Sequence, residues 1–311
     1  MDLSSTIRAR RGRPPSTAVL VGLAAAVAVV LSANAVVLVA GTEDRAATGA
    51  SVLGQVVTAP TSTAGARTVH AGAGVPVDVH LPAGAGPHPV VLYVHGGGWT
   101  SGDRAEVPDE LGILDVVDEG WAVVSTGYRP ADAATGVTAR EQATDVATAL
   151  GWVRSHGRAL SLDDRVVAVG HSAGAHLVAL VAATAPPAVR PDAVLLVSGV
   201  YDFGPDVVRN PMLGPGVEAA LGCAGDCASR PSVEPATYAD PDDPRVAIVH
   251  GSADGIVTPA TAERYGRALA LADVAVDVHL VPQGEHIGAR LGSAARAVLA
   301  ALTSGSAAGR S

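Results

Sequence analysis

Short apolar segments typical of buried β-strands alternate with longer segments of helical periodicity through most of this chain. Two of the apolar segments, 166–169 and 193–197, contain no polar residue, as expected for strands whose faces are both covered by helices. The alternation predicts an α/β fold with a mostly parallel central sheet flanked by helices. Strands are expected at 75–81, 89–94, 120–126, 165–169, 193–197, 245–249 and 274–281, the first of them at the sheet edge, and helices at 138–156, 173–183, 259–271 and 289–302.

The amino-acid composition supports a large folded domain and argues against one class of partner. Apolar residues make up 48% of the 311 residues and charged residues 16%, so a sizeable core can form and global disorder is excluded. The net charge is −9, although residues 1–40 contain four arginines and only one aspartate. Because the rest of the chain is strongly acidic, nucleic acid is not expected as a partner.

An uncharged N-terminal segment predicts a membrane anchor. Residues 18–40 are almost wholly apolar and follow four arginines that lie between positions 8 and 13. As a helix they would span about 34 Å, enough for a hydrocarbon core of about 30 Å, and the arginines would remain cytoplasmic. A cleaved signal peptide is the alternative, with Ala33-Asn34-Ala35 as its cleavage site.

Either reading of the N-terminus places the body of the chain outside the cytoplasm. The expected organisation is a basic cytoplasmic segment at 1–16, an anchor or signal helix at 17–40, a linker at 41–66 and a folded domain at 67–305. In an oxidising compartment, Cys223 and Cys227 can close a small disulfide loop; two free thiols are the alternative.

The pentapeptide Gly170-His171-Ser172-Ala173-Gly174 matches the pattern G-x-S-x-G. It follows an expected strand and opens an expected helix, which is the setting in which this pattern forms a sharp turn around a nucleophilic serine. Glycine at both ends leaves room for the turn. The start of the helix favours negative charge that develops near Ser172.

A second glycine-rich loop, His95-Gly96-Gly97-Gly98-Trp99, also follows an expected strand. Consecutive glycines leave backbone N–H groups unobstructed, so the loop can direct them at an oxyanion. His95 is expected to steady this loop.

A serine nucleophile needs a base and an acid that orients the base. His286 lies in the loop after the last expected strand, and Asp254 lies in the loop after the preceding strand. The order Ser172, Asp254, His286 is the chain order of serine hydrolases with a G-x-S-x-G turn. Asp202, which also follows a strand, is the rival acid. Among the other histidines, His171, His176 and His250 are expected to be structural.

With these motifs the chain resembles α/β-hydrolases of the esterase/lipase kind, close to the hormone-sensitive-lipase-like, acetyl-esterase-like and BD-FAE-like branches. The resemblance covers about residues 67–303 and departs from many relatives after Tyr128-Arg129, where Pro130-Ala131-Asp132 replaces Leu-Ala-Pro-Glu. The matching residues are His95–Trp99, Ser101-Gly102-Asp103, Tyr128-Arg129-Pro130, Gly170–Gly174, Asp254 and His286.

The resemblance implies an α/β-hydrolase fold in which Ser172, Asp254 and His286 form a catalytic triad. By likeness, the N–H groups of Gly97, Gly98 and Ala173 would form the oxyanion hole, while Asp145 and Trp152 would be structural. A lid-like insertion is implied at about 201–244, where the candidates to line an acyl pocket are Val207, Val208, Met212 and Leu213.

The implied activity is hydrolysis of small-molecule carboxylic esters with short-to-medium acyl chains through an acyl-enzyme, without a metal or organic cofactor. An amidase or peptidase that uses the same triad is the alternative, as is a membrane-tethered binding protein that has lost the chemistry. Kynurenine-formamidase-like relatives tend to carry Tyr in the glycine loop, so Gly98 argues against that activity.

Overall fold

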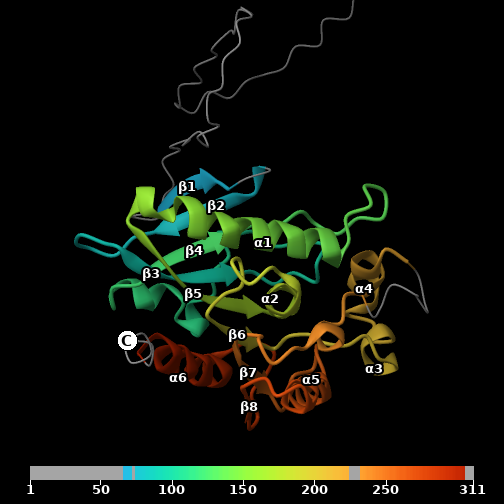
Figure 1. Ribbon diagram of the computed structural model, residues 1–311. Coiled ribbons are helices and arrows are strands. Elements are labelled where there is room, and N and C mark those ends of the chain that lie inside the picture. The colour runs from blue at the N-terminus through green and yellow to red at the C-terminus, as the bar shows by residue number, and fades with distance from the viewer. Residues whose placement is uncertain (1–65, 72–73, 224–231, 305–311) are drawn as a thin grey trace, which may run out of the picture. The chain divides into compact units, whose positions relative to one another are not determined.

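The computed structural model describes residues 66–71, 74–223 and 232–304, which contain an eight-stranded sheet in the order β1-β2-β4-β3-β5-β6-β7-β8. Figure 1 shows this order from β1 at the top to β8 at the bottom. Strands β3 to β8 run parallel, whereas β2 pairs antiparallel with both β1 and β4. The strands are β1 (Ala66–His70), β2 (Pro76–His80), β3 (His88–Val94), β4 (Ala122–Thr126), β5 (Leu162–His171), β6 (Ala193–Val197), β7 (Arg245–Gly251) and β8 (Val276–Val281).

Helices cover both faces of this sheet. One face packs against α1, α2 and α5, and the other packs against α6 and two 3-10 turns, η2 (Asp109–Leu111) and η3 (Leu114–Val117). Helix α1 begins with a capping box in which Thr138 and Glu141 satisfy each other's backbone N–H groups. The helices are α1 (Ala139–His156), α2 (Ala173–Thr184), α3 (Pro205–Val208), α4 (Gly214–Leu221), α5 (Pro259–Leu271) and α6 (Ala289–Ser304).

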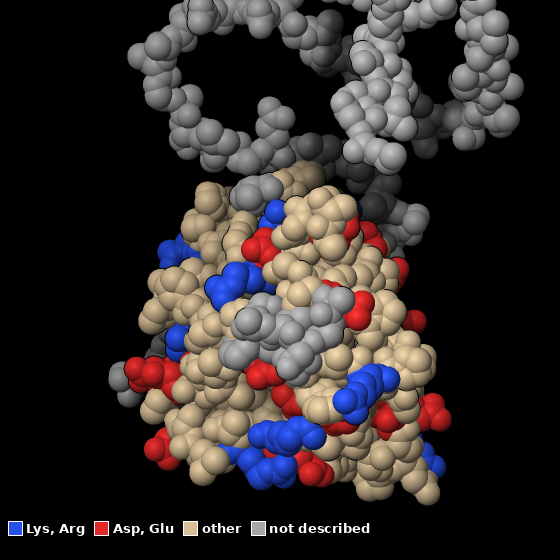
Figure 2. All heavy atoms as spheres, turned by 90° about the vertical axis from the view of Figure 1, so that its right-hand side faces the viewer, with Lys and Arg blue, Asp and Glu red and all other residues tan. Residues whose placement is uncertain are grey.

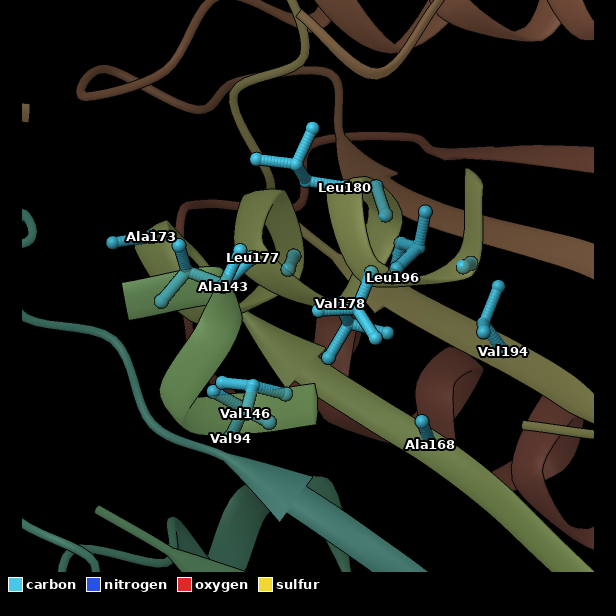
Figure 3. Close-up of a cluster of buried hydrophobic side chains, with 14 of the residues drawn as sticks. Val94, Ala143, Val146, Ala168, Ala173, Leu177, Val178, Leu180, Val194 and Leu196 are labelled. Carbon is cyan, nitrogen blue, oxygen red and sulfur yellow. The ribbon is translucent and has the colours of Figure 1, made fainter. Parts of the chain in front are cut away.

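Helix α2 lies in the centre of the core. Residues 173–183 are all buried, because the helix fits between the sheet and α1. Figure 3 shows Leu177 and Val178 of this helix among side chains of β3, β6 and α1, such as Val94, Leu196 and Val146. Burying each Leu or Val stabilises the fold by about 1.5–3 kcal/mol. The helix that follows Ser172 is therefore firmly held.

The prediction of a mostly parallel sheet flanked by helices is confirmed, with one correction at the sheet edge. The strand expected at 75–81 corresponds to β2, which is not an edge strand because β1 pairs along its outer side, from Ala66 opposite His80 to His70 opposite Pro76. The short segment Ala66–His70 carries no strand signal of its own in the sequence. Its pairing depends on β2, so it could not be predicted locally.

The predicted basic segment, anchor or signal helix and almost all of the linker lie within residues 1–65, outside the described residues. In the part of the chain that the structure describes, no helix combines the length and the apolar character that crossing a membrane requires.

Candidate active site

Three loops at the carboxyl edge of the sheet carry the residues predicted to form the triad. Ser172 lies between β5 and α2, Asp254 follows β7, and His286 follows β8. Strands β5 to β8 run parallel, so these loops emerge at the same edge. The fold thus brings together two residues, Ser172 and His286, that are separated by 114 positions in the sequence.

The turn around Ser172 is strained and tightly packed. Ser172 has φ 54° and ψ −122°, a backbone conformation that residues other than glycine rarely adopt. Its N–H donates to the carbonyl oxygen of Val197 at 2.9 Å. A Cβ at Gly170 would collide with the backbone of α2, and one at Gly174 would collide with the backbone at the end of β3. Glycine at both positions therefore permits the turn that places the Ser172 side chain, 8% exposed, at the start of α2.

His286 connects the serine to the aspartate. Its Nε2 lies 3.0 Å from Ser172 Oγ, and its Nδ1 lies 2.8 Å from Asp254 Oδ2. The second carboxylate oxygen, Oδ1, accepts the backbone N–H groups of Ile256 at 2.9 Å and Val257 at 2.8 Å. The loop's own backbone thus fixes the carboxylate. In this geometry Nε2 can accept the serine proton while Nδ1–H remains bonded to Asp254.

The electrostatic surroundings keep Asp254 charged. Burial alone would raise the pKa of Asp254, but hydrogen bonds from His250 and His286 and from backbone N–H groups outweigh it and hold the pKa well below its usual range. Asp254 is therefore ionised at neutral pH and can stabilise an imidazolium at His286.

His171 lies beside His286, with its ring centroid 5.1 Å from that of His286 and its Nε2 3.3 Å from the His286 carbonyl oxygen. Burial and the neighbouring His286 lower the pKa of His171 to about 4. At neutral pH His171 is therefore uncharged and places no positive charge next to His286.

The glycine-rich loop after β3 lies directly against the serine. A Cβ added at Gly96 would be 3.1 Å from the Cβ of Ser172. Gly97 has φ 112°, a backbone conformation that only glycine adopts readily. In the described residues, no hydrogen-bond acceptor faces the backbone N–H groups of Gly97, Gly98 and Ala173. These N–H groups are thus free to donate to a bound ligand.

Two side chains from outside hold this loop in place. The Tyr128 hydroxyl donates to the carbonyl oxygens of His95 at 3.1 Å and Gly96 at 3.0 Å, and the His95 ring stacks on Tyr128 at 4.3 Å. Gln142 of α1 donates to the carbonyl oxygen of Trp99 at 2.6 Å. Hydrogen bonds at both ends of the glycine-rich loop therefore restrain its backbone.

A buried chain of hydrogen bonds fastens Trp99 to α2; the sequence predicted a structural role for His176 but not its partners. The indole Nε1–H of Trp99 donates to His176 Nδ1 at 3.0 Å, and His176 Nε2–H donates to the carbonyl oxygen of Val233 at 2.7 Å. Phe203 packs on both rings. The two bonded rings are 77 positions apart in the sequence, and only the tertiary fold joins them.

We expect His176 to make folding pH-dependent. Burial lowers the pKa of His176 from 6.5 to about 4, and the hydrogen bond to the Val233 carbonyl oxygen offsets this only in part. As pH falls from 6.5 to 4, the unfolded chain binds a proton that the folded chain does not, so the free energy of unfolding should fall by about 3 kcal/mol for this residue. Urea denaturation at several pH values measures it.

Replacing His176 by leucine should remove this part of the pH dependence and destabilise the protein at pH 7 by about 3 kcal/mol, because two buried polar groups lose their partner. When Trp99→Phe is combined with His176→Leu, it should lower the free energy of unfolding by less than it does in the wild-type protein. An unchanged pH slope in His176→Leu would show that this histidine is not the group that titrates.

Asp202, the rival acid, is occupied elsewhere. Its carboxylate lies 2.8 Å from Arg264 Nη2 and accepts the Thr261 hydroxyl at 2.9 Å. Asp145 likewise pairs with Arg129 at 2.8 Å, in keeping with the structural position that the resemblance implied. Of the carboxylates considered from the sequence, Asp254 is the one that contacts His286.

The insertion after β6 differs from the expected acyl pocket. Val207 and Leu213 are buried in the core, and Met212 is 67% exposed, so these side chains do not share one cavity wall. Helix α4 instead approaches the glycine loop, because a Cβ added at Gly216 would lie 2.5 Å from the carbonyl oxygen of Gly98. Cys223 is disulfide-bonded, whereas Cys227 lies outside the described residues.

The sheet order, the helices on both faces and the serine turn define an α/β-hydrolase fold. A propionate-bound esterase from Thermogutta terrifontis shares it with a TM-score of 0.62, at 22% identity over 81% of this chain and 99% of that chain. Residues 77–190 match the BD-FAE family model. The resemblance to BD-FAE-like α/β-hydrolase esterases is thereby confirmed.

Curated relatives carry two activities in their names. The chain is 29% identical to the probable carboxylic ester hydrolase LipM of Mycobacterium tuberculosis, over 55% of this chain and 42% of the relative. It is 35% identical to a kynurenine formamidase of Danio rerio, over 42% of this chain and 44% of the relative. The chain thus spans less than half the length of either relative.

Proposed function

We propose that this protein is a serine hydrolase that cleaves small carboxylic esters through the triad Ser172, His286 and Asp254. The observation that carries the proposal is the pair of distances at His286, 3.0 Å to the serine oxygen and 2.8 Å to the aspartate oxygen. The names of its relatives, among them the mycobacterial esterases LipM and LipQ, support an ester as the substrate.

In the proposed reaction, Ser172 Oγ attacks the ester carbonyl carbon as its proton moves to His286 Nε2. The N–H groups of Gly97, Gly98 and Ala173 stabilise the oxyanion, and each such donor contributes about 3–4 kcal/mol to the transition state. The intermediate collapses, the leaving alkoxide takes the proton from His286, and Ser172 holds the acyl group. Water then attacks, passes a proton to His286, and releases the carboxylic acid and the serine.

The surroundings of the serine favour a short acyl group. Helix α4 approaches the glycine loop at Gly98, and three of the side chains expected to line an acyl pocket do not do so together: Val207 and Leu213 are packed in the core and Met212 is exposed. On the face that carries α3 and α4, the described residues in view are mostly uncharged, with basic and acidic side chains interspersed (Figure 2). This mixture of charges gives no reason to expect a strongly charged substrate.

An aromatic formamide is the second candidate substrate, because three of the curated relatives are named kynurenine formamidases. The same triad can cleave an amide if His286 protonates the leaving nitrogen. Gly98 in the glycine-rich loop, where kynurenine-formamidase-like relatives tend to carry Tyr, argues against formamidase activity. Comparing p-nitrophenyl acetate with formanilide separates the two candidates.

The test combines turnover with covalent trapping. The full chain should hydrolyse p-nitrophenyl acetate and butyrate with a higher kcat/KM than the octanoate and palmitate esters. An activated alkyl phosphonate should abolish turnover and add its mass to the peptide that contains Ser172, with p-nitrophenyl butyrate protecting against labelling. Labelling at another serine, or turnover that survives complete labelling, would contradict the proposal.

A further inference from the structure

A second histidine contacts the proposed triad aspartate. His250, near the end of β7, has its Nε2 3.2 Å from Asp254 Oδ2, the same oxygen that accepts His286 Nδ1–H. Both side chains of this second contact are completely buried. The sequence, in which His250 ends an expected strand, predicted only that this histidine is packed and not catalytic.

The hydrogen bonds of His250 specify its tautomer. Its Nε2 also lies 3.1 Å from the carbonyl oxygen of Val257, which can only accept. Nε2 therefore carries the proton and shares it between the Val257 carbonyl oxygen and Asp254 Oδ2 in a bifurcated hydrogen bond. Nδ1 is buried and has no hydrogen-bond partner in the described part of the chain, in keeping with an unprotonated ring nitrogen.

We propose that His250 is a positioning residue that holds the Asp254 carboxylate and limits how strongly it attracts the proton on His286. The inference rests on the proposed function, because it assigns His250 a role in the same triad. Asp254 is thus held by four donors, namely the side chains of His250 and His286 and the backbone N–H groups of Ile256 and Val257.

The shared oxygen gives the contact its chemical consequence. A hydrogen bond from His250 withdraws electron density from Oδ2, so the carboxylate stabilises a protonated His286 less strongly than a free carboxylate would. Without this donor, His286 would keep its proton to higher pH. The titratable groups around Asp254 are His250 on β7, His286 after β8 and His171 on β5. Of these, only His286 exchanges a proton in the proposed reaction.

Two substitutions separate positioning from packing. In His250→Gln the amide nitrogen can reach the place of the imidazole Nε2 and still donate to Asp254. In His250→Met the side chain fills a similar volume but donates nothing. A packing role predicts similar behaviour of the two variants, whereas a positioning role predicts that Gln resembles the wild type and Met does not.

The experiment measures the pH profile of kcat/KM for p-nitrophenyl acetate and, without substrate, the NMR titration of His286 in 15N-histidine-labelled protein. The His286 signals are assigned by their loss in His286→Asn. For His250→Met we expect the acidic limb of the kcat/KM profile and the midpoint of the His286 NMR titration to move to higher pH by about 0.5 unit. We also expect kcat to fall about tenfold, with KM little changed. His279→Met, which removes an exposed histidine of β8, is the matched control.

The two readouts keep this proposal separate from the proposed function. A shifted NMR midpoint in the Met variant, with a wild-type midpoint in the Gln variant, supports the positioning role even if no tested ester is hydrolysed. Equal midpoints in the wild type and in folded His250→Met would overturn it even if ester turnover is high. If His250→Met does not fold, a His250→Gln midpoint equal to the wild-type value supports the role. A His286 midpoint in His250→Gln that differs from the wild-type value overturns the positioning role.

Discussion

Ser172→Ala is expected to lower kcat for p-nitrophenyl acetate by about 10⁵- to 10⁶-fold, because no other group can take the acyl chain. The substitution removes only Oγ, whose partner is His286 Nε2 at 3.0 Å. The Cβ and the strained backbone at φ 54° are retained, so the free energy of unfolding should change by less than about 1 kcal/mol. Turnover is followed by p-nitrophenol release, and folding by urea denaturation.

Ser198 provides a matched control. It follows β6 at the same edge of the sheet, has φ 50°, and donates its N–H to the next strand at Val249, as Ser172 does at Val197. Its hydroxyl is buried and has no hydrogen-bond partner among the described residues. Ser198→Ala should therefore leave kcat within about twofold and not destabilise the fold. Equal losses of kcat in both variants would indicate a general effect of altering this edge of the sheet. A Ser172→Ala variant that kept its activity would exclude Ser172 as the nucleophile.

The positions of Ser172, Asp254 and His286 were predictable because each follows a strand that the sequence already indicates. Parallel strands end at one edge, so the order of strands brings residues far apart in the chain to the same place. The choice of Asp254 over Asp202 also followed from loop position, and the structure adds a physical reason, since Arg264 neutralises Asp202.

The supporting contacts were not predictable by the same reasoning. The bond from Trp99 to His176 depends on how a loop side chain meets a buried helix, and His250 reaches Asp254 only because the loop after β7 turns back on its own strand. The four-residue α3 and the eight-residue α4 lie in a Gly- and Pro-rich stretch, whose periodicity is too short to indicate a helix. Such features arise from tertiary packing, whereas strand ends are marked locally.

Asp254→Asn is expected to lower kcat by about 10⁴-fold, because it changes the tautomer of His286. Oδ1 accepts two backbone N–H groups, from Ile256 and Val257, so the amide oxygen of asparagine must take that side. The amide NH₂ group then occupies the place of Oδ2 and faces His286 Nδ1. Since NH₂ can only donate, Nδ1 must accept, and the imidazole proton moves to Nε2. A protonated Nε2 cannot remove the serine proton.

His250 makes the same substitution unfavourable for folding. Its Nε2–H donates to Val257 as well as to Asp254 Oδ2, so it cannot readily become an acceptor for the new NH₂ group. Two donors would then face each other in a buried site, and the free energy of unfolding should fall by about 1–3 kcal/mol. Nitrogen-15 NMR should show the proton of His286 on Nε2 in the variant and on Nδ1 in the wild type.

Asp202→Asn is the control, since its carboxylate contacts Arg264 and Thr261 and not His286. It should leave kcat/KM within about twofold while weakening the attachment of α5. A loss below about tenfold in Asp254→Asn, with the proton still on Nδ1, would mean that another group orients the base. A large loss in Asp202→Asn with normal folding would point to Asp202, the rival acid that the sequence offered.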